Sequence, residues 1–373
     1  MRALRLGMVG GGSGAFIGNV HRMAARLDGQ FDLVAGALSS DPDRARQSAT
    51  DLDLARTYTD FAEMARAEAA RTDGIEAVAI VTPNHMHAAP ARAFLEQGIH
   101  VICDKPLTAT QEDARDLAAT CEKADALFIL THTYSGYAMI RQAREMVARG
   151  DIGAVRLVQV EYAQDWLTED STSRQADWRT DPAKSGAGAV GDIGTHAWHL
   201  ARFVSGLKVE ELSAELTSFV PGRRVDDNVQ AMLRFQGGAR GSLWVSQVAP
   251  GHDNTVRIRV FGDKGGLDWA HESPGHLHFT PFGQPRRILT QNGPGATDAA
   301  TRLSRVPAGH PEGYVEAFAN IYAEAARAIR AYQSGVSMSP DVTYPGIADG
   351  MDGMAFIDAC LRSSANNAKW VTP

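Results

Sequence analysis

The sequence has few cysteines: three in 373 residues, and no two of them form a C-x-x-C pair. An odd number without such a pair argues against a disulfide framework and against a cysteine-based zinc site. Cys103, Cys121 and Cys360 therefore favour a reducing compartment.

Positive charge and long apolar runs are also scarce. Lys and Arg number 37 against 44 Asp and Glu, a formal net charge of −7, whereas phosphate backbones and anionic membranes attract a positive surface. No run approaches the roughly 18 apolar residues that span a bilayer, and glycines follow the N-terminus before a secretory apolar core could form. We predict a cytoplasmic protein that binds neither nucleic acid nor membrane.

What the sequence does contain is the composition of a globular protein, with 44% hydrophobic and 22% charged residues. At about 100 to 200 residues per domain, the length predicts two domains. Residues 1–131 alternate short β-branched runs with longer helical stretches, which predicts a doubly wound α/β domain with a parallel sheet. Its expected strands are residues 4–10, 31–38, 77–81, 100–103 and 127–131.

Residues 132–373 have a different sequence pattern, in which several runs alternate polar and apolar residues. This period of two predicts half-buried strands, two of them joined as a hairpin, at residues 155–162, 228–235, 239–246 and 255–261. We predict an α+β domain with a large, mainly antiparallel open sheet. Two stretches rich in glycine or proline, residues 181–191 and 283–311, are predicted to be long functional loops.

A glycine-rich turn follows the first expected strand and precedes a stretch with helical spacing. Glycine lets the backbone approach a pyrophosphate, and the N–H groups and dipole at the start of the next helix favour its negative charge. This order is typical of a dinucleotide-binding Rossmann domain, and a purely structural turn is the alternative. The cofactor-binding residues predicted here are Gly10, Gly12, Ser13, Gly14, Ala15, Phe16 and Ile17.

The end of the second expected strand bears on the choice between NAD and NADP, because an acidic side chain there would accept from the ribose hydroxyls. Ser39 stands at that position, Asp41 follows two residues later, and Arg44 could instead face a phosphate. A helix cap at Asp41 and a solvated Arg44 explain the same residues equally well. We predict NAD, with NADP possible, and include Ser39, Ser40 and Arg44 among the cofactor-binding residues.

Four short motifs stand in a definite order: residues 81–87 (VTPNHMH), 103–106 (CDKP), 191–196 (GDIGTH) and 309–314 (GHPEGY). Over nearly the whole chain these motifs resemble the Gfo/Idh/MocA oxidoreductases. The resemblance implies an NAD(P)-dependent dehydrogenase that acts on CH–OH groups. It also adds cofactor-binding residues, namely Thr82, Pro83, Asn84, His87, Asp104 and Lys105.

The sequence departs from the family pattern at three places. Asp104 replaces the glutamate that usually precedes the lysine, which shortens the acid by one methylene. The glycine turn carries extra residues, so Gly18 and His21 match the family's third glycine and the histidine after it. Ser39 replaces the usual acid of the second strand, which leaves the cofactor preference open.

Oxidation of a secondary alcohol needs a hydride acceptor, a base for the hydroxyl proton and a group that stabilises the developing alkoxide. Asp192 and His196 are four residues apart, so on a helix they share one face and can form a carboxylate-oriented imidazole. The resemblance makes His196 the proton acceptor. Lys105 follows a parallel strand, where open α/β sheets bind ligands, and we assign it an orienting and electrostatic role.

Each of these residues also has a structural explanation. Asp192 could cap its helix, His196 could be a hydrogen-bonded core histidine, and Lys105 could be solvated. A metal site is a further alternative, because Asp192, His196 and His199 could converge on one helical face and His85 pairs with His87. Without an H-E-x-x-H motif we predict no metal.

Substrate recognition is predicted mainly in the second domain, where aromatic faces and charged side chains suit a polyhydroxylated ring, although such aromatics also serve packing. Tyr162 is one of the aromatic residues that precede the loop leading to Asp192. The predicted substrate-binding residues are Lys105, His132, Tyr134, Asp165, Trp166, Trp178, Arg179, Asp192, Thr195, His196 and His310. His310 could serve the site of a neighbouring subunit.

Residues 37–42 and the long glycine turn most resemble those of the family's bacterial inositol or aldose dehydrogenases, in particular the scyllo-inositol type that also accepts L-glucose. Levoglucosan, glucosides oxidised at C3 and myo-inositol are open alternatives. Two rival functions are an NAD-using glycosidase with no net redox change and a non-catalytic nucleotide-sensing regulator. The resemblance also implies a homodimer or homotetramer, in which relatives pair the open faces of their second-domain sheets.

Overall fold

The computed structural model describes residues 2–170 and 173–373. By its internal contacts the chain forms two compact units. The first unit comprises residues 1–133 and 318–351, and the second comprises residues 134–317 and 352–373. Within the described residues, no helix has both the length and the apolar character that crossing a membrane requires.

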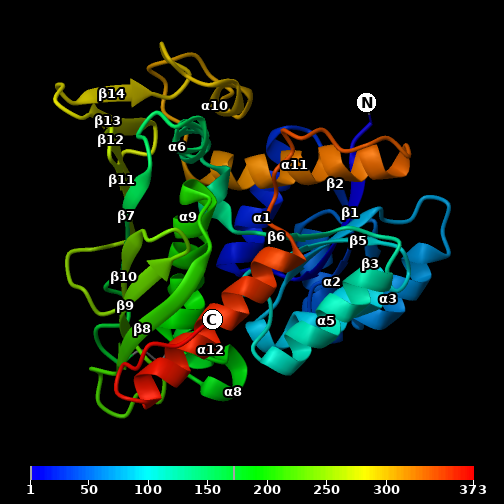
Figure 1. The fold of residues 1–373 in the computed structure, drawn as a ribbon. Helices are drawn as coiled ribbons and strands as arrows, with labels where there is room; N and C mark the ends of the chain where they lie inside the picture. The colour runs from blue at the N-terminus through cyan, green and yellow to red at the C-terminus, as the bar shows by residue number, and fades with distance from the viewer. Residues whose placement is uncertain (1, 171–172) are drawn as a thin grey trace. The chain divides into compact units, whose positions relative to one another are not determined.

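The first unit is built on a six-stranded, all-parallel sheet in the order β3-β2-β1-β4-β5-β6 (Figure 1). Its strands are β1 (Leu4–Gly10), β2 (Phe31–Ala37), β3 (Arg56–Thr57), β4 (Ala77–Val81), β5 (His100–Cys103) and β6 (Phe128–Leu130). The strand order reverses beside β1: β2 and β3 lie on one side of it, and β4, β5 and β6 lie on the other. Open α/β sheets bind ligands at the carboxyl ends of the strands beside such a switch point.

Helices connect these strands, and polar side chains fix where several of them begin. They are α1 (Phe16–Leu27), α2 (Pro42–Asp51), α3 (Phe61–Ala69), η1 (Asn84–Met86), α4 (Ala88–Leu95) and α5 (Gln111–Lys123). Asp60 accepts from the Glu63 amide at 2.7 Å, and the hydroxyl of Thr110 accepts from the Asp113 amide at 3.1 Å. Such caps satisfy amides that the helix itself leaves unpaired. The predicted doubly wound Rossmann fold is confirmed.

A segment far along the chain also belongs to the first unit, although the sequence assigns it to the 132–373 domain. Helix α11 (Tyr314–Gln333) contributes Tyr322, whose ring packs edge-on against Phe31 with centroids 5.5 Å apart. Leu130 at the end of β6 donates its amide to the Pro345 carbonyl at 2.8 Å. Buried rings and main-chain hydrogen bonds thus attach residues 318–351 to the first unit.

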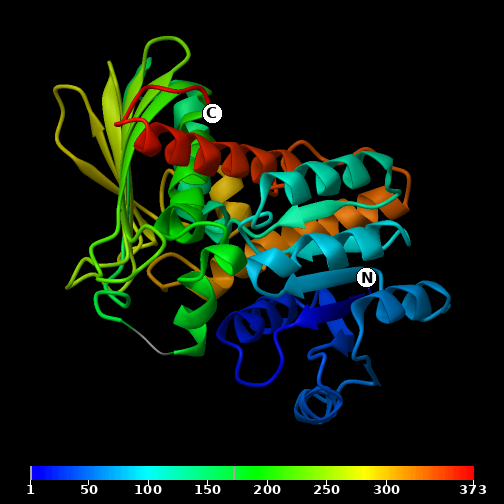
Figure 2. The same cartoon turned by 90° about the horizontal axis from the view of Figure 1, so that it is seen from below.

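The second unit contains an eight-stranded mixed sheet in the order β14-β13-β12-β11-β7-β10-β9-β8 (Figure 1). The same strands, coloured from green to yellow, are seen from below in Figure 2. Only β7 and β10 pair in parallel, and the other described pairs are antiparallel. The strands are β7 (Val155–Ala163), β8 (Val209–Thr217), β9 (Asn228–Phe235), β10 (Arg240–Ser246), β11 (Thr255–Gly262), β12 (Gly265–Ala270), β13 (His276–Pro281) and β14 (Arg287–Thr290). The predicted α+β domain and its β9–β10 hairpin are confirmed.

Alternation along the strands decides which face of this sheet is packed. In β9 Val229, Ala231, Leu233 and Phe235 are buried, while Met232 between them is 54% exposed. The buried face packs against helices of the same unit, with α9 on β7, β10 and β11 and with α6 beside α9. The helices that lie wholly in this unit are α6 (Ala138–Arg149), α7 (Arg174–Arg179), α8 (Pro182–Ser185), η3 (Val190–Gly194), α9 (Thr195–Ser205) and α10 (Asp298–Arg302). Three helices have residues in both units, namely η2 (Thr133–Gly136), α11 and α12 (Ile347–Ala365). Their residues 134–136, 314–317 and 352–365 belong to the second unit.

The two predicted long loops are wrong in part, because each contains regular structure. Residues 181–191 include α8 and the start of η3, and residues 283–311 include β14 and α10. Asp181 caps α8 by accepting from the Ala183 amide at 3.2 Å, and Thr297 caps α10. These helices are too short for their apolar period to be visible in sequence, so the glycine and proline content dominated the prediction.

Candidate active site

The glycine turn after β1 depends on close approach of two backbones. Gly10, Gly11 and Gly14 have φ between +67° and +83°, a region that favours glycine. A Cβ on Gly18 would lie 2.5 Å from the Gly11 Cα, so only glycine lets α1 pack directly on the turn. Ala15, the N-cap of α1, has no side-chain acceptor, and the first amides of this helix suit a phosphate group.

Helix α2 holds the same turn in place. The Ser13 amide donates to the Ser48 hydroxyl at 3.1 Å, and the Ser13 hydroxyl donates to Asp51 at 2.6 Å. Phe16, the first residue of α1, is 67% exposed. The predicted cofactor residues of the turn therefore form one compact structure, in which the glycines, Ser13 and Ala15 lie between β1 and α1.

At the end of β2 the structure shows that Asp41 caps a helix. Its carboxylate accepts from the Arg44 amide at 2.9 Å, and its own amide donates to the Ser39 hydroxyl at 3.2 Å. Ser40 and Arg44 are exposed. The cap that we considered as an alternative is thus present, and the role of Ser39, Ser40 and Arg44 toward a ribose stays a prediction.

The motif after β4 is tied to the motif after β5 by a buried histidine. His87 Nδ1 lies 2.8 Å from the Pro106 carbonyl, and its Nε2 lies 2.9 Å from the Thr82 carbonyl. Burial lowers the pKa of His87. Asn84 is buried in η1, while Thr82 and Pro83 are half-buried. His87 therefore joins two loops at the carboxyl edge of the sheet.

Asp104 lies at the end of β5 among several hydrogen-bond donors. Its Oδ1 accepts from the Lys105 amide at 2.9 Å and from the Thr131 hydroxyl at 3.0 Å. His21 Nε2 is 3.9 Å from the same oxygen, and His21 Nδ1 is 2.8 Å from the Tyr322 hydroxyl. Burial disfavours the charge of Asp104, but the hydrogen bond and charge from His21 and the charge of Lys105 outweigh it and hold its pKa below the usual range.

Lys105 is half-buried directly after Asp104, and its peptide bond to Pro106 is cis. His132, predicted to bind substrate, is 2% exposed just after β6. Both residues follow neighbouring strands of the parallel sheet, whose carboxyl ends meet at one edge. The first unit thus places the glycine turn, Lys105 and His132 at the edge where ligands of such sheets bind.

In the second unit Asp192 lies in the π-helical turn η3, and His196 lies in the first turn of α9. Asp192 Oδ2 accepts from Arg179 Nε at 3.2 Å and from Gln247 Nε2 at 2.9 Å. His196 is 7% exposed, and the Tyr134 ring packs edge-on against it with centroids 5.0 Å apart. Single π turns inside helices are frequent at functional sites.

A hydrogen-bonded group of side chains supports Tyr134. Its hydroxyl donates to the Tyr162 hydroxyl at 2.8 Å and accepts from Asn254 Nδ2 at 3.1 Å, while Tyr162 donates to Asn254 Oδ1 at 2.9 Å. Burial raises the pKa of Tyr134 to about 12. Tyr134 is 2% exposed, so the structure gives it a packing role beside His196. Substrate binding by Tyr134 stays a prediction.

Arg179 brings three predicted residues together. Besides its contact with Asp192, its guanidinium lies 4.2 Å from the Trp178 ring centroid and 6.0 Å from that of Trp166. Trp166 Nε1 donates to Gln164 Oε1 at 2.9 Å. These contacts assemble a charged and aromatic cluster around Asp192.

The other predicted substrate residues have separate local contacts. Asp165 Oδ2 accepts from the Gly251 amide at 3.4 Å, and the buried Thr195 donates its hydroxyl to the Gly191 carbonyl at 3.0 Å. His310 is exposed on the segment before α11, with its Nδ1 3.1 Å from the Pro307 carbonyl. These contacts do not include the predicted catalytic residues.

Sequence reasoning did not identify Gln247, Asn254 or Gln164. An isolated amide side chain carries no motif, and only the sheet register brings residues 247 and 254 beside the helix segment that bears Asp192 and His196. Asn254 directly precedes β11, and Gln247 directly follows β10. Their position at strand ends is the only signal that could have singled them out.

Among the described residues, no group of three or more His, Cys, Asp and Glu side chains is arranged to hold a metal ion. Burial and the neighbouring arginines Arg202, Arg141 and Arg144 lower the pKa of His199 to about 3. Three arginines near an imidazole would also repel a cation.

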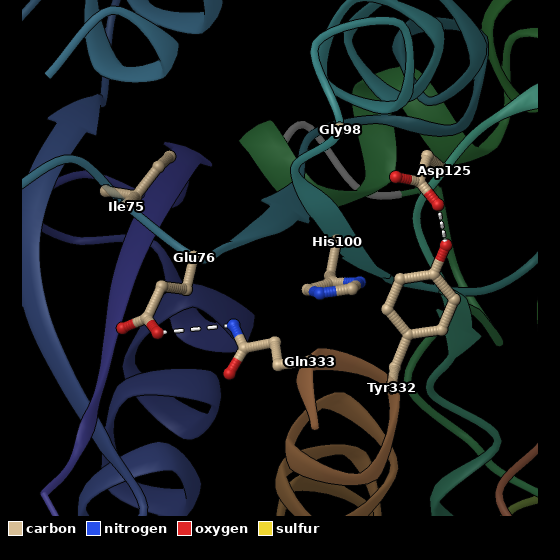
Figure 3. Close-up of a pocket in the computed structure, with 7 residues that line it drawn as sticks. All are labelled: Ile75, Glu76, Gly98, His100, Asp125, Tyr332 and Gln333. Atoms are coloured by element: carbon tan, nitrogen blue, oxygen red, sulfur yellow. Dashed lines mark hydrogen bonds between the residues drawn. The ribbon is translucent and has the colours of Figure 1, made fainter. Parts of the chain in front are cut away.

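A hollow of about 530 Å³ lies at the amino-terminal edge of the first unit's sheet (Figure 3). Figure 3 shows the Tyr332 hydroxyl directed at Asp125 and the Gln333 amide directed at Glu76. Gln333 Nε2 donates to Glu76 Oε1 at 3.3 Å. Its lining residues are Ile75, Glu76, Gly98, His100, Asp125, Tyr332 and Gln333. Because β4 and β5 begin here, this hollow lies at the opposite edge from the glycine turn and Lys105.

Known proteins match the chain over its whole length. Residues 4–132 match the model of an oxidoreductase family with an NAD-binding Rossmann fold, and residues 140–268 match the GFO/IDH/MocA C-terminal domain. An oxidoreductase from Sinorhizobium meliloti is 56% identical, with 100% of both chains covered and a TM-score of 0.92.

Two further relatives are named as a dehydrogenase, or the homolog of a dehydrogenase, of a polyol or sugar. An inositol dehydrogenase homolog from Azotobacter vinelandii, solved with NAD+, is 35% identical over 100% of this chain and 98% of that chain, with a TM-score of 0.96, and a second structure of it contains NADH and myo-inositol. Levoglucosan dehydrogenase from Pseudarthrobacter phenanthrenivorans is 27% identical over 100% of this chain and 98% of its own length. The chain belongs to the Gfo/Idh/MocA family of NAD-dependent oxidoreductases.

Proposed function

We propose that this protein oxidises a secondary alcohol of a cyclic polyol or sugar to the ketone or lactone. Relatives that bind myo-inositol and levoglucosan support this substrate class. The cluster of Arg179, Trp166 and Trp178 supports it as well, because aromatic faces and charged donors suit a polyhydroxylated ring. Among the candidates, scyllo-inositol and L-glucose are the first to test, followed by myo-inositol, levoglucosan and glucosides, which would be oxidised at C3.

In the proposed reaction His196 accepts the hydroxyl proton and Asp192 orients its imidazole. The observation that carries this proposal is the arrangement of Asp192, whose carboxylate is held by Arg179 and Gln247 one helical turn before the buried His196. NAD, when bound, supplies the hydride acceptor. Lys105 stabilises the charge that develops on the reacting oxygen.

The cofactor would be held by the carboxyl edge of the first unit's sheet. We assign the pyrophosphate to the residues of the glycine turn between β1 and α1, where the backbone can approach it closely. We assign Thr82, Pro83, Asn84, His87 and Asp104 to the same cofactor site, and recognition of the ribose to Ser39, Ser40 and Arg44. The direct contacts of Asp41 explain it as a helix cap, so we do not include it.

A substrate screen followed at the nicotinamide absorbance, with NAD and NADP in parallel, tests this function. We expect steady NADH formation with at least one of the inositols, aldoses and anhydrosugars. Hydrolysis of glycosides without net NADH formation would instead support the NAD-using glycosidase. Tight cofactor binding without turnover of any of these compounds would support a regulator.

Variants of the two histidines in α9 test the mechanism. His196→Gln should lower kcat by about 100-fold or more, the usual contribution of general acid–base catalysis. His199→Gln is the matched control, since His199 is equally buried in the same helix and lies three residues further along; it should keep its kcat. Full activity in His196→Gln would overturn the proposed role.

We also propose a homotetramer in the cytoplasm that acts in carbohydrate metabolism, with His310 presented to a neighbouring subunit. The exposure of His310 and of the outer face of the large sheet, including Met232, is compatible with this. Light scattering measures the subunit number. An undiminished substrate affinity in His310→Ala would contradict its part in the proposal.

A further inference from the structure

Asp226 is a buried acid that the proposed reaction does not use. It lies between β8 and β9, and both of its carboxylate oxygens accept from main-chain amides. Oδ1 accepts from the Gly188 amide at 2.9 Å, and Oδ2 accepts from the Val190 amide at 2.7 Å. The Asp226 carbonyl accepts from the amide of Ala189, also at 2.9 Å. One residue thus binds three consecutive amides.

These three amides belong to the segment that opens η3. The first N–H groups of a helix have no partner within the helix, so an outside acceptor determines where the helix begins. A Cβ on Gly188 would lie 1.9 Å from the Asp226 carbonyl oxygen, which means that the approach requires glycine. Asp192 follows Val190 by two residues, and its amide donates back to the Gly188 carbonyl at 2.9 Å.

A second link runs from the neighbouring main chain to the Asp192 side chain. The Gln247 amide donates to the Asp227 carbonyl at 2.8 Å, and Gln247 Nε2 donates to Asp192 Oδ2 at 2.9 Å. Gln247 is 2% exposed. The Asp226 side chain therefore holds the backbone of Asp192 through Gly188, and the main-chain carbonyl of Asp227 holds the Asp192 carboxylate through Gln247. The Asp227 side chain is not part of this link, because its carboxylate binds the backbone of residues 219 and 220.

We propose that Asp226 is a positioning residue for the oxidation. By capping residues 188–190 it determines where η3 begins, and this sets the positions of Asp192 and His196. The proposal rests on the proposed function, because it assumes that Asp192 and His196 carry the proton transfer. A displacement of about 1 Å in such groups can lower a rate by about 100-fold.

The first test replaces the carboxylate without changing its size. In Asp226→Asn one amide of the segment still has an acceptor, while the new NH2 group faces the other N–H. We expect kcat for the polyol oxidised fastest in the screen to fall by about 10- to 100-fold. The affinity for NAD, measured by fluorescence titration, should not change, because the predicted cofactor residues belong to the first unit.

The matched control is Asp227→Asn, one residue further along. Asp227 is also buried, but its carboxylate binds a different segment, accepting from the Phe219 amide at 3.0 Å and the Val220 amide at 3.1 Å. Both variants should lose thermal stability, but only Asp226→Asn should lower kcat. Equal losses of kcat in both would show general destabilisation and overturn the proposal.

Two further measurements separate this inference from the proposed function. In Asp226→Asn, hydrogen exchange should speed up at the backbone amides of residues 188–190. Because Asp226 is proposed to act through Asp192, Asp226→Asn should lower kcat less in the Asp192→Asn background than in the unaltered protein. An unchanged kcat in Asp226→Asn, with His196→Gln impaired, would overturn the inference alone. Full activity in His196→Gln would overturn the function and the inference together.

Discussion

Asp104 and Asp226 are inward-facing carboxylates, one in each unit, whose pKa values shift in opposite directions. Burial disfavours the charge of both, but Asp104 faces His21 and Lys105, which hold its pKa below the usual range. Asp226 has two backbone amides and the like charge of Asp227, and burial raises its pKa to about 6. Positive neighbours, rather than burial alone, decide whether such an acid is stably ionised.

The difference separates two uses of a carboxylate. Asp104 joins β5, β6 and α1 through the Lys105 amide, the Thr131 hydroxyl and the His21 imidazole, so its charge stabilises the folded unit. Asp226 holds the start of a helix with main-chain partners only. Asp192, which those main-chain bonds place, is the acid that we assign to the reaction. Each of these assignments gives a different expected result when the acid is replaced.

Among the acids, the largest effect is expected from Asp192→Asn. The amide keeps one oxygen but loses the charge that pairs with Arg179 and that would stabilise an imidazolium at His196. We expect kcat to fall by about 100-fold, with little change in thermal stability because Asp192 is partly exposed. Steady-state kinetics and thermal unfolding measure the two quantities. Asp177→Asn, an exposed acid of α7, is the control, and an unchanged kcat in Asp192→Asn would assign the chemistry to another residue.

Asp104→Asn should act mainly on stability, by about 2 kcal/mol at pH 7, since hydrogen bonds to charged groups contribute about that much. The pKa of Asp104 is lowered in the folded state, so its contribution is present above the unfolded pKa of about 3.9 and is lost as pH falls through the folded pKa. Urea unfolding at pH 7 and at pH 3.5 should therefore show a smaller deficit at the lower pH.

Asp32→Asn serves as the control for this experiment, because Asp32 is an exposed acid on β2 of the same unit. Its free energy of unfolding should match that of the unaltered protein at both pH values. A deficit in Asp104→Asn that grew as the pH fell would mean that Asp104 is neutral in the folded state, and its contrast with Asp226 would disappear.

The opposite pH dependence is expected for Asp226→Asn. The folded pKa of about 6 lies above the unfolded value, so the contribution of Asp226 is complete below about pH 3.9 and is lost as pH rises through about 6. The deficit in unfolding free energy should be about 1 to 2 kcal/mol larger at pH 4.5 than at pH 7.5. An equal deficit at both pH values would contradict the raised pKa.

Much of the first unit could be predicted from the sequence because its signals are local. Three of its five expected strands have the observed bounds, and the other two, 31–38 and 127–131, are shorter by one or two residues. The Asp41 cap and the glycine turn are likewise short-range patterns. The attachment of residues 318–351 was missed, since it depends on Tyr322 and Pro345 meeting residues hundreds of positions earlier.

The second unit shows where local patterns stop being sufficient. The motif at residues 191–196 led to Asp192 and His196, but a π turn has no period that the sequence displays. The partners of Asp192 come from a strand end and a short helix, and the register of the sheet alone brings Gln247 to it. Asp226 was missed for the same reason, because its three amide partners lie nearly 40 residues away in the chain.

The smallest effect concerns a further acid, Asp41, for which the sequence offered two explanations, a helix cap and a cofactor contact. As a cap of α2 it accepts from the Arg44 amide, so Asp41→Ala should cost about 1 kcal/mol of unfolding free energy, whereas Asp41→Asn should cost little because asparagine caps nearly as well. Neither change should alter the dissociation constant of NAD. If Asp41→Asn weakened NAD binding while leaving stability intact, this acid would also recognise the ribose. Asp41 would then both stabilise the fold and contact the cofactor, so the separation between structural acids and ligand-binding acids would not hold at the end of β2.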